Sequence, residues 1–258
     1  MSRLRARCPD CRTLTAVSLG GEYQCHSCGR EFGAGLVRVP RAWGVGGEPM
    51  AEAAWLPLPW PEAGVIDEES PEAQAERLAA ELPDRPLVLG GCCCAHVGAV
   101  QRLAARRGRV GVVWLDQHGD LNTPATSLSG NRWGMPLREL IDAGSVSAQD
   151  VALVGAWDLD SPEQDFVRES GLHTGPTGVA RALEGTVGVY VALDCDVLDP
   201  AAIVSHMPSS RGLALADVES LLARIAASAD VLGAGLSGLV PDERNVESLS
   251  RLLRALGL

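Results

Sequence analysis

Lysine is missing from this chain of 258 residues, in which all 22 basic side chains are arginine. Aromatic residues make up only 4% of the sequence, and it contains no run of ~18 uninterrupted apolar residues. Without such a run an ordinary membrane-spanning helix is excluded, so we expect no membrane partner. No apolar stretch follows the arginines of residues 1–12, which argues against a secretory signal and favours a cytoplasmic protein. The 46% of hydrophobic residues suffices for a globular core.

Positive charge is scarce, because 33 acidic residues outnumber 22 basic ones and give a net charge of -11. Residues 1–35 differ, with five arginines against three acids and hence a net charge of +2; the five are Arg3, Arg5, Arg7, Arg12 and Arg30. The remainder therefore carries -13 and repels nucleic acid. A charge of +2 without interleaved aromatic residues is a small footprint for phosphate, so we do not expect a nucleic acid partner.

Four of the eight cysteines form two Cys-x-x-Cys pairs, Cys8 with Cys11 and Cys25 with Cys28. Two such turns supply the tetrahedral thiolate shell of zinc, so the spacing predicts a zinc ribbon over residues 1–35 with one structural zinc ion. Because so short a segment cannot bury a core, the metal would supply the folding free energy. The alternative is a pair of disulfides, which a reducing compartment disfavours.

Residues 36–64 are rich in glycine and proline, at a density that argues against regular helix. We therefore predict a linker or an irregular covering segment here. Trp43, Trp55 and Trp60 lie within it, which indicates that it packs against the following domain.

Short apolar runs alternate with helical patterns from residue 65 onward. Ser70 before Pro71 is typical of a helix start, and Ser161 with Gln164 is typical of a capping box. Strands that are apolar throughout are buried on both faces, and their alternation with helices indicates parallel pairing. Residues 65–258 are thus predicted to form a three-layer α/β/α sandwich with a mainly parallel sheet. The expected strands cover residues 87–89, 111–115, 151–155, 187–193 and 231–236, and the expected helices residues 70–82, 95–107, 161–171 and 243–256.

Acidic residues follow two of these strands, at the edge where parallel sheets bind ligands. Asp116, His118 and Asp120 come after the second strand, and Asp194 and Asp196 after the fourth. In extended chain, alternate residues project the same way, so each group can face one ion or an ion pair. Gathered carboxylates repel one another unless divalent cations neutralise them. The pattern predicts two metals ~4 Å apart, the geometry that ionises a nucleophilic water.

These motifs resemble the signature of the ureohydrolase superfamily, which includes arginase, agmatinase and formimidoylglutamase. The resemblance rests on Asp-x-His-x-Asp at 116–120, Ser-Gly-Asn at 129–131 with Gly-Met-Pro at 134–136, and Asp-Cys-Asp-Val-Leu-Asp-Pro at 194–200. It covers roughly residues 65–258. It implies an eight-stranded sheet, two manganese ions bridged by a hydroxide that attacks a guanidinium carbon, and a trimer or hexamer.

Carried over residue by residue, the resemblance gives each of these acids a role. Asp116 and Asp194 correspond to the carboxylates that bridge the two metals. His118 and Asp196 correspond to ligands of the second ion, and Asp120 to a ligand of the first ion that also orients the hydroxide. Asp120 is therefore the expected catalytic residue.

The loop at 129–133 corresponds to the part of the family that contacts the substrate. Ser129 and Asn131 match residues that touch its non-reacting end. Trp133 stands in the same loop, where many family members carry a proton-shuttling histidine, and indole cannot perform that task. A small-molecule substrate is thus expected, at a site altered from the family pattern.

Two further departures affect the metals and the reacting group. Gly90-Gly91-Cys92-Cys93 replaces the family's Gly-Gly-Asp-His, so Cys93 takes the place of a histidine ligand and shifts the preference from manganese toward zinc or iron. His96, about one helical turn later, is an alternative ligand. Gly238 stands where the family has the glutamate that pairs with the guanidinium, so a cationic substrate would lose that partner.

These residues leave two hypotheses for function. The first is a metal-dependent hydrolase of a C–N bond in a guanidino, amidino or amide compound. The second is a catalytically inactive member that serves as a binding or assembly module. A mononuclear thiolate site with different chemistry lies between them. The lone Cys195 is interpreted as a small buried hydrophobe.

Overall fold

The protein is described by a computed structural model that covers residues 5, 8, 11, 13–19, 22–32 and 35–258. Arg3, Arg7 and Arg12, which contribute to the basic charge of the first 35 residues, lie outside the described residues. Within the described ranges, no helix has both the length and the apolar character needed to cross a membrane.

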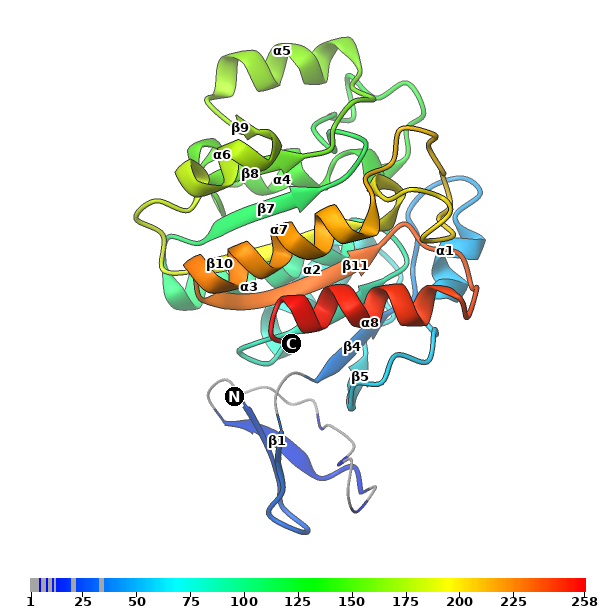
Figure 1. The fold of residues 1–258 in the computed structure, drawn as a ribbon, viewed down its shortest axis with the longest axis vertical. Helices are drawn as coiled ribbons and strands as arrows, with labels where there is room; N and C mark the ends of the chain where they lie inside the picture. The colour runs from blue at the N-terminus through cyan, green and yellow to red at the C-terminus, as the bar shows by residue number, and fades with distance from the viewer. Residues whose placement is uncertain (1–4, 6–7, 9–10, 12, 20–21, 33–34) are drawn as a thin grey trace.

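The body of the protein is built on one eight-stranded sheet in the order β5-β4-β6-β11-β10-β7-β8-β9 (Figure 1). Neighbouring strands of this sheet pair in parallel throughout the described residues. The strands are β4 (Leu36–Val39), β5 (Glu62–Val65), β6 (Leu87–Gly90), β7 (Gly111–Leu115), β8 (Val151–Val154), β9 (His173–Thr174), β10 (Val189–Asp194) and β11 (Val231–Ser237). The prediction of a parallel sheet made of strands buried on both faces is confirmed.

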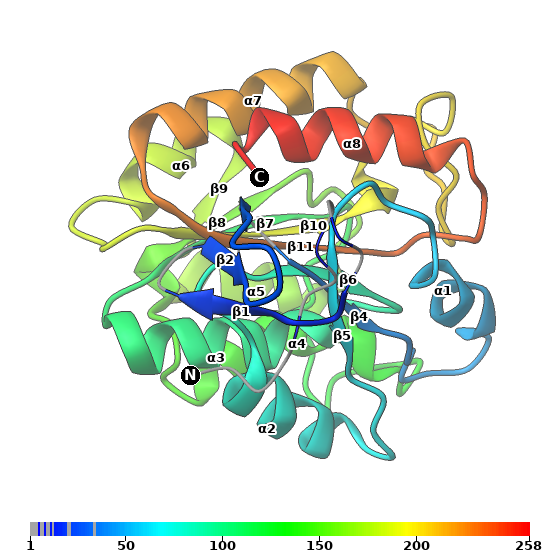
Figure 2. The same ribbon diagram turned by 90° about the horizontal axis from the view of Figure 1, so that it is seen from below.

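Helices cover both faces of this sheet (Figure 2). One layer contains α6 (Gly175–Ala182), α7 (Leu215–Ser228) and α8 (Asn245–Ala255), and the other contains α2 (Pro71–Glu81), α3 (Ala95–Arg107) and α4 (Pro136–Asp142). Two more helices, α1 (Glu48–Ala53) and α5 (Ser161–Ser170), lie toward the edges of the body. The predicted three-layer α/β/α sandwich is confirmed.

Local sequence determines where these helices begin. Ser70 caps α2, because its hydroxyl accepts a hydrogen bond from the Ala73 N–H at 3.1 Å. The capping box of α5 begins at Asp160 and not at Ser161 as expected, since Asp160 and Glu163 each bind the other's backbone. An aspartate one residue earlier competes well for the cap position, which explains the shift.

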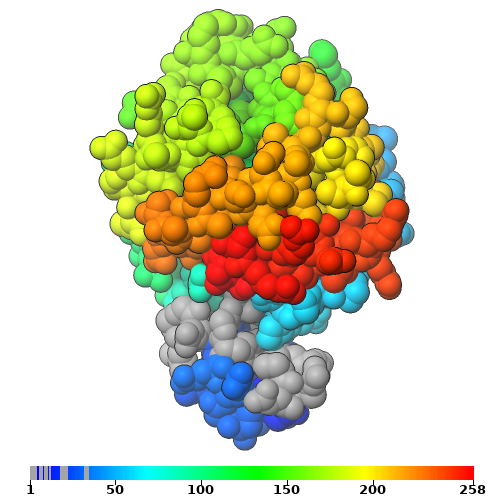
Figure 3. Space-filling model, in the orientation of Figure 1, coloured from blue at the N-terminus to red at the C-terminus, as the bar shows by residue number. Residues whose placement is uncertain are grey.

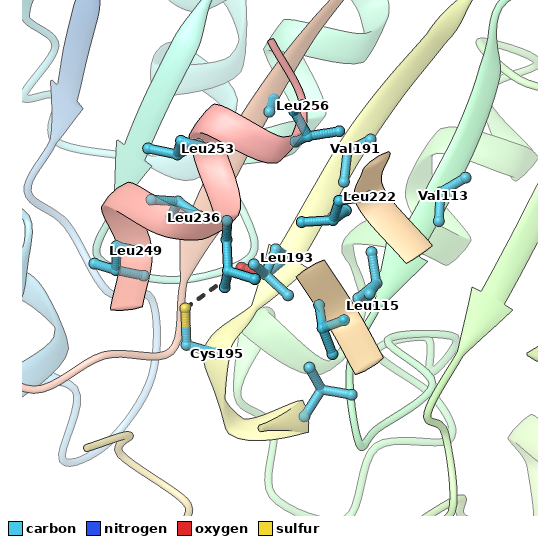
Figure 4. Close-up of a cluster of buried hydrophobic side chains, with 14 of the residues drawn as sticks. Val113, Leu115, Val191, Leu193, Cys195, Leu222, Leu236, Leu249, Leu253 and Leu256 are labelled. Atoms are coloured by element: carbon cyan, nitrogen blue, oxygen red, sulfur yellow. Dashed lines mark hydrogen bonds between the residues drawn. The ribbon is translucent and has the colours of Figure 1, made fainter. Parts of the chain in front are cut away.

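The core on the α7 and α8 side is aliphatic (Figure 4). Leu193 and Leu236 from the sheet meet Leu222 of α7 and Leu249 of α8 in one cluster. Cys195 belongs to this cluster and is fully buried, with its thiol directed at the Leu193 carbonyl at 4.0 Å. Its interpretation as a small buried hydrophobe fits this position.

Residues 36–64 differ from the expected irregular segment, because they contribute β4, β5 and the short helix α1. Buried Arg38 joins these parts: its guanidinium donates to the Ala54 and Leu56 carbonyls and pairs with Glu62 at 2.7 Å. The prolines fall outside the two strands, so the apolar run Leu36–Val39 can pair on both sides. With β4, β5 and the two-residue β9, the five expected strands become eight.

The described N-terminal residues form a separate antiparallel sheet of β1 (Ala16–Leu19), β2 (Glu22–Cys25) and β3 (Glu31–Phe32). It lies next to β4 and β5, and its blue atoms project from the body in the space-filling view (Figure 3). Tyr23 joins the two parts, since its buried ring packs against Gly35 and belongs to the same apolar cluster as Val37.

Candidate metal centre

The predicted core ligands meet at the carboxyl end of the sheet. Cys93 follows β6, Asp116 follows β7 and Asp194 ends β10, and these strands lie within four neighbouring positions of the sheet. The fourth strand of the group, β11, ends at Ser237. Parallel strands thus bring side chains from distant parts of the sequence to one edge.

Two groups of potential ligands share Asp116. Cys93, Asp116 and Asp120 form one group, and Asp116, His118 and Asp196 form the other; within each group the ligand atoms lie within 4.8 Å of one another. A shared carboxylate between two ligand groups is the arrangement that holds a metal pair.

Asp194 joins both groups. Its Oδ2 accepts a hydrogen bond from the Cys93 thiol at 2.9 Å, and its Oδ1 accepts one from the Asp196 N–H at 3.0 Å. All six core residues predicted from the sequence, including Cys93, are therefore close together, although their roles as ligands stay predictions.

Asp120 is the most constrained of these residues. It is the one non-glycine residue with positive φ (53°) in the described part of the chain, and it is 3% exposed. Its Oδ2 has no hydrogen-bond partner among the described residues. Burial, and then the charge of Asp116, raise the pKa of Asp120 well above its usual value. A buried carboxylate oxygen without a donor is a good position for a cation.

The other acids carry the same signature. Burial, followed by the charge of Asp196, raises the pKa of Asp194 to about 7. Burial also lowers the pKa of His118, but hydrogen bonds to Asp116 and Asp196 outweigh it and raise that pKa to about 12. The His118 Nδ1 lies 3.2 Å from Asp116 Oδ1 and 3.1 Å from Asp196 Oδ2. The cluster attracts positive charge, so the residues present fit a divalent cation.

Cys93 is buried, and burial together with the charge of Asp120 raises the pKa of its thiol well above the ordinary value. Within this hard oxygen cluster it is the one soft donor. His96 is not part of either ligand group. Its Nε2 contacts Ser237 Oγ at 3.2 Å, and Ser237 lies between His96 and Cys93. The alternative of His96 as the ligand is therefore not favoured by the geometry.

The predicted substrate loop, residues 129–133, lines a pocket beside the cluster of candidate ligands. A pocket of about 230 Å³ is lined by His118 and Asp120 on one side and by Ser129, Asn131 and Trp133 on the other. The loop is fixed from outside, because Asn131 Oδ1 accepts a hydrogen bond from the Val45 N–H at 2.9 Å. Residues 129–133 thus lie where a substrate at the cluster would extend.

Sequence reasoning missed the acidic wall of this pocket, which consists of Asp158, Asp160 and Glu163. These residues follow β8, so the rule applied after β7 and β10 would have found them. Glu163 is held by the backbone N–H groups of Leu121 and Asp160, both at 2.9 Å. Asp158 lines the pocket and is exposed.

Gly238 has no room for a side chain. Its φ is +71°, and a Cβ atom there would overlap the Asp194 carboxylate, lying 2.5 Å from its Cγ. The backbone conformation and the nearby Asp194 carboxylate therefore both require glycine at position 238, and a glutamate there would need both to move.

A second candidate metal site lies in the N-terminal sheet. Cys8, Cys11, Cys25 and Cys28 have sulfur atoms within 4.8 Å of one another, and the Cys8–Cys28 and Cys11–Cys25 separations are 3.6 and 3.5 Å. Four thiols at this spacing from two turns fit a tetrahedral zinc site. The cysteine cluster is thus where the predicted ribbon would hold its ion.

A family model described as the arginase family matches residues 62–254. The chain belongs to the arginase family. Among curated proteins, the arginase of Staphylococcus aureus strain COL is 36% identical to this chain over 140 residues. The match covers 45% of this chain and 46% of that protein. The arginase of Bacillus caldovelox is 35% identical over 142 residues, covering 45% and 48%. The chain spans about half the length of the curated relatives it matches.

Solved structures extend the likeness of this arginase-family chain to most of its fold. The arginase of Bacillus subtilis superimposes with a TM-score of 0.74 at 21% identity, over 86% of this chain and 97% of the other. The formimidoylglutamase of the same organism gives 0.71 at 16% identity, over 87% and 86%. The resemblance to the ureohydrolase superfamily is thereby confirmed.

Proposed function

We propose that this arginase-family chain is a metal-dependent hydrolase of a C–N bond in a guanidino, amidino or amide small molecule. The observation that carries the proposal is that two groups of potential ligands share Asp116 and lie beside a pocket that Asp120 lines. When bound, two divalent cations would polarise the substrate and lower the pKa of a water molecule.

The side chains divide this work between them. Asp116 and Asp194 would bridge the cations, with His118 and Asp196 at one end and Cys93 and Asp120 at the other. Besides holding a cation, the Asp120 carboxylate would orient the attacking water. Ser129, Asn131 and Trp133 would hold the non-reacting part of the substrate.

The altered positions point to a changed substrate. Gly238 provides no carboxylate for a cationic guanidinium, so a neutral amide or amidine becomes a candidate for the reacting group. Trp133 supplies an apolar wall and only an indole N–H donor. Asp158 and Asp160, which also line the pocket, favour a substrate with a positively charged tail.

The test is a screen of guanidino, amidino and amide compounds with the manganese-, zinc- or iron-loaded protein. Asp120→Asn and Asp196→Ala should each abolish turnover while the far-UV circular dichroism stays unchanged. Asp217→Asn is the matched control, because this exposed carboxylate lies in the first turn of α7. Equal turnover by the wild type and both site variants would overturn the proposal.

The second candidate is an inactive module for binding or assembly. The observation that favours it is the joint replacement at Cys93, Trp133 and Gly238. A protein that binds no metal at its core and hydrolyses nothing in the screen would support this candidate over the enzyme.

For the cysteine cluster, we propose that residues 1–35 form a zinc ribbon with one structural ion, and that the sheet domain follows it. By resemblance to the family, we also propose a homo-oligomer, a trimer or hexamer, located in the cytoplasm. Sedimentation equilibrium of the full chain distinguishes these assemblies from a monomer.

A further inference from the structure

A buried chain of hydrogen bonds leads from the core of the sheet to Cys93. The Tyr190 hydroxyl lies 3.1 Å from His96 Nδ1, and His96 Nε2 lies 3.2 Å from Ser237 Oγ. Ser237 Oγ in turn lies 3.2 Å from both Cys93 Sγ and Asp194 Oδ2. Tyr190, His96 and Ser237 come from β10, α3 and β11, and all three have 0% exposure.

The surrounding sequence makes room for this chain. Gly235 lies on β11 opposite His96 and Tyr190, and a Cβ atom there would overlap both the imidazole and the phenol oxygen. The His96 ring also meets Trp114 edge-on at 5.3 Å, which fixes its plane. The three polar groups are therefore held in one arrangement within an apolar environment.

The direction of the hydrogen bonds follows from the donors available. Burial lowers the pKa of His96 to about 3, so the ring is neutral and carries one N–H. Among the described residues, the buried Tyr190 O–H has His96 Nδ1 as its one hydrogen-bond acceptor. If Nδ1 carried the proton, the Tyr190 O–H would be left unpaired at a cost of ~1–3 kcal/mol. Nδ1 therefore accepts, and the proton sits on Nε2.

This tautomer determines what Ser237 can do. Nε2–H donates to Ser237 Oγ, so the single hydroxyl proton of Ser237 is free to point at Asp194 Oδ2 or Cys93 Sγ. In the metal-free protein the Cys93 thiol itself donates to Asp194. A thiolate ligand has lost that proton, and the Ser237 hydroxyl then remains as a side-chain donor to Cys93 or Asp194 Oδ2.

We propose that Tyr190, His96 and Ser237 form a directional relay of hydrogen bonds that turns the Ser237 hydroxyl proton toward Cys93 or Asp194 and thereby positions these two residues for a thiophilic divalent ion. These three are positioning residues, because they act through Cys93 and Asp194. The inference rests on the proposed metal centre, and it adds a set of residues that decides how the soft ligand is held.

The tautomer is tested on the full zinc-loaded chain by nitrogen NMR of the imidazole rings. Five histidines contribute signals, and His96→Gln identifies the one from His96. The relay predicts a neutral ring protonated at Nε2 at neutral pH. A ring protonated at Nδ1, or an imidazolium, would overturn it whether or not the core binds metal.

The effect on the ligands is tested by Co²⁺ titration of the full chain with the ribbon filled by zinc. The thiolate-to-cobalt absorption band reports ligation by Cys93, and Cys93→Ser sets its zero. Ser237→Ala should weaken Co²⁺ binding about tenfold or more and shift the band, and Tyr190→Phe should weaken it less. Ser248→Ala is the control, because this serine instead donates to the Ala202 carbonyl.

The outcomes separate the two ideas. If Cys93→Ser leaves Co²⁺ affinity and spectrum unchanged, Cys93 is not a ligand and the proposed metal centre fails at that position. If Cys93→Ser removes the band but Ser237→Ala and Tyr190→Phe behave as the wild type, the centre stands and the relay is wrong.

Discussion

Gly238 and Asp194 approach so closely that any side chain at position 238 would overlap the aspartate carboxylate. Asp194 is the acid that joins the two candidate ligand groups. From the resemblance to the family, Gly238 is the position expected to carry an acid for a guanidinium. The absence of a side chain at position 238 and the packing of the candidate metal centre around Asp194 are thus one structural feature.

This contact predicts that Gly238→Ala destabilises the protein more than Gly130→Ala. Both glycines have φ of +71°, but a Cβ atom at Gly130 would meet nothing within 4 Å. Each change should cost about 1–2 kcal/mol for the backbone, and Gly238→Ala a further ~1–3 kcal/mol for the overlap, with weaker metal binding. Denaturant unfolding measures both, and equal losses would show that Asp194 moves aside freely.

Replacing the soft ligand should change the metal preference. Cys93→His should bind Mn²⁺ more tightly, on the order of tenfold or ~1.4 kcal/mol, since imidazole replaces a thiol. Calorimetric titration of the core site measures this. Cys94→Ser is the control, because that neighbouring thiol packs with Met50 in a different cluster. Unchanged Mn²⁺ affinity in Cys93→His would place Cys93 outside the ligand set.

The pKa of Asp194 predicts an unusual pH dependence for the protein with a metal-free core. Folding raises the pKa of Asp194 from 3.8 to about 7, so between these pH values the folded protein binds more protons than the unfolded chain. The resulting stabilisation is fully present below pH 3.8 and is lost as the pH rises through 7. We therefore expect stability to fall between about pH 4 and 7, by a few kcal/mol at most.

His118 acts in the same direction at higher pH. Its pKa of about 12 means that its stabilising charge is fully present below 6.5 and is lost as pH rises through 12. Thermal melting at a series of pH values tests both groups, with Asp194→Asn as the variant that should lose the lower part of the slope. A melting temperature that rises from pH 4 to 7 without core metal contradicts this assignment.

The cysteine cluster predicts a separable metal. Cys28→Ser should lose about one zinc per chain and lower the melting temperature, because the small N-terminal sheet has little core of its own. Cys92→Ser should keep that zinc, because the buried Cys92 thiol follows β6 in the sheet domain and is not part of the four-cysteine cluster. Elemental mass spectrometry of both variants decides, and a full zinc complement in Cys28→Ser would remove the ribbon site.

The sequence predicted the sheet and most of the acidic cluster because both are local patterns. Asp116, His118 and Asp120 follow one strand directly, and parallel pairing then brings them to Asp194. The short strand Leu36–Val39 was not predicted, because the glycines and prolines around it are typical of irregular structure. Pairing with two partner strands, β5 and β6, stabilises it in the fold.

Other parts of the site depend on packing between distant elements. Ser237 lies near Cys93 because β11 is a neighbour of β6, and His96 reaches it from a helix. The overlap at Gly238 depends on a backbone angle and on the position of Asp194. No spacing in one sequence encodes such contacts, so the role of these residues emerges only from the fold.

The central claim, a metal pair sharing Asp116, is tested most directly by counting transition-metal ions per chain. Elemental mass spectrometry would be applied to the full chain purified anaerobically without chelator, to the Cys25→Ser/Cys28→Ser variant and to Asp116→Ala. The account predicts that two ions remain when the ribbon cysteines are replaced, and that these are lost in Asp116→Ala. A single ion that disappears with the ribbon cysteines, with no further ion taken up on adding metal, would contradict it.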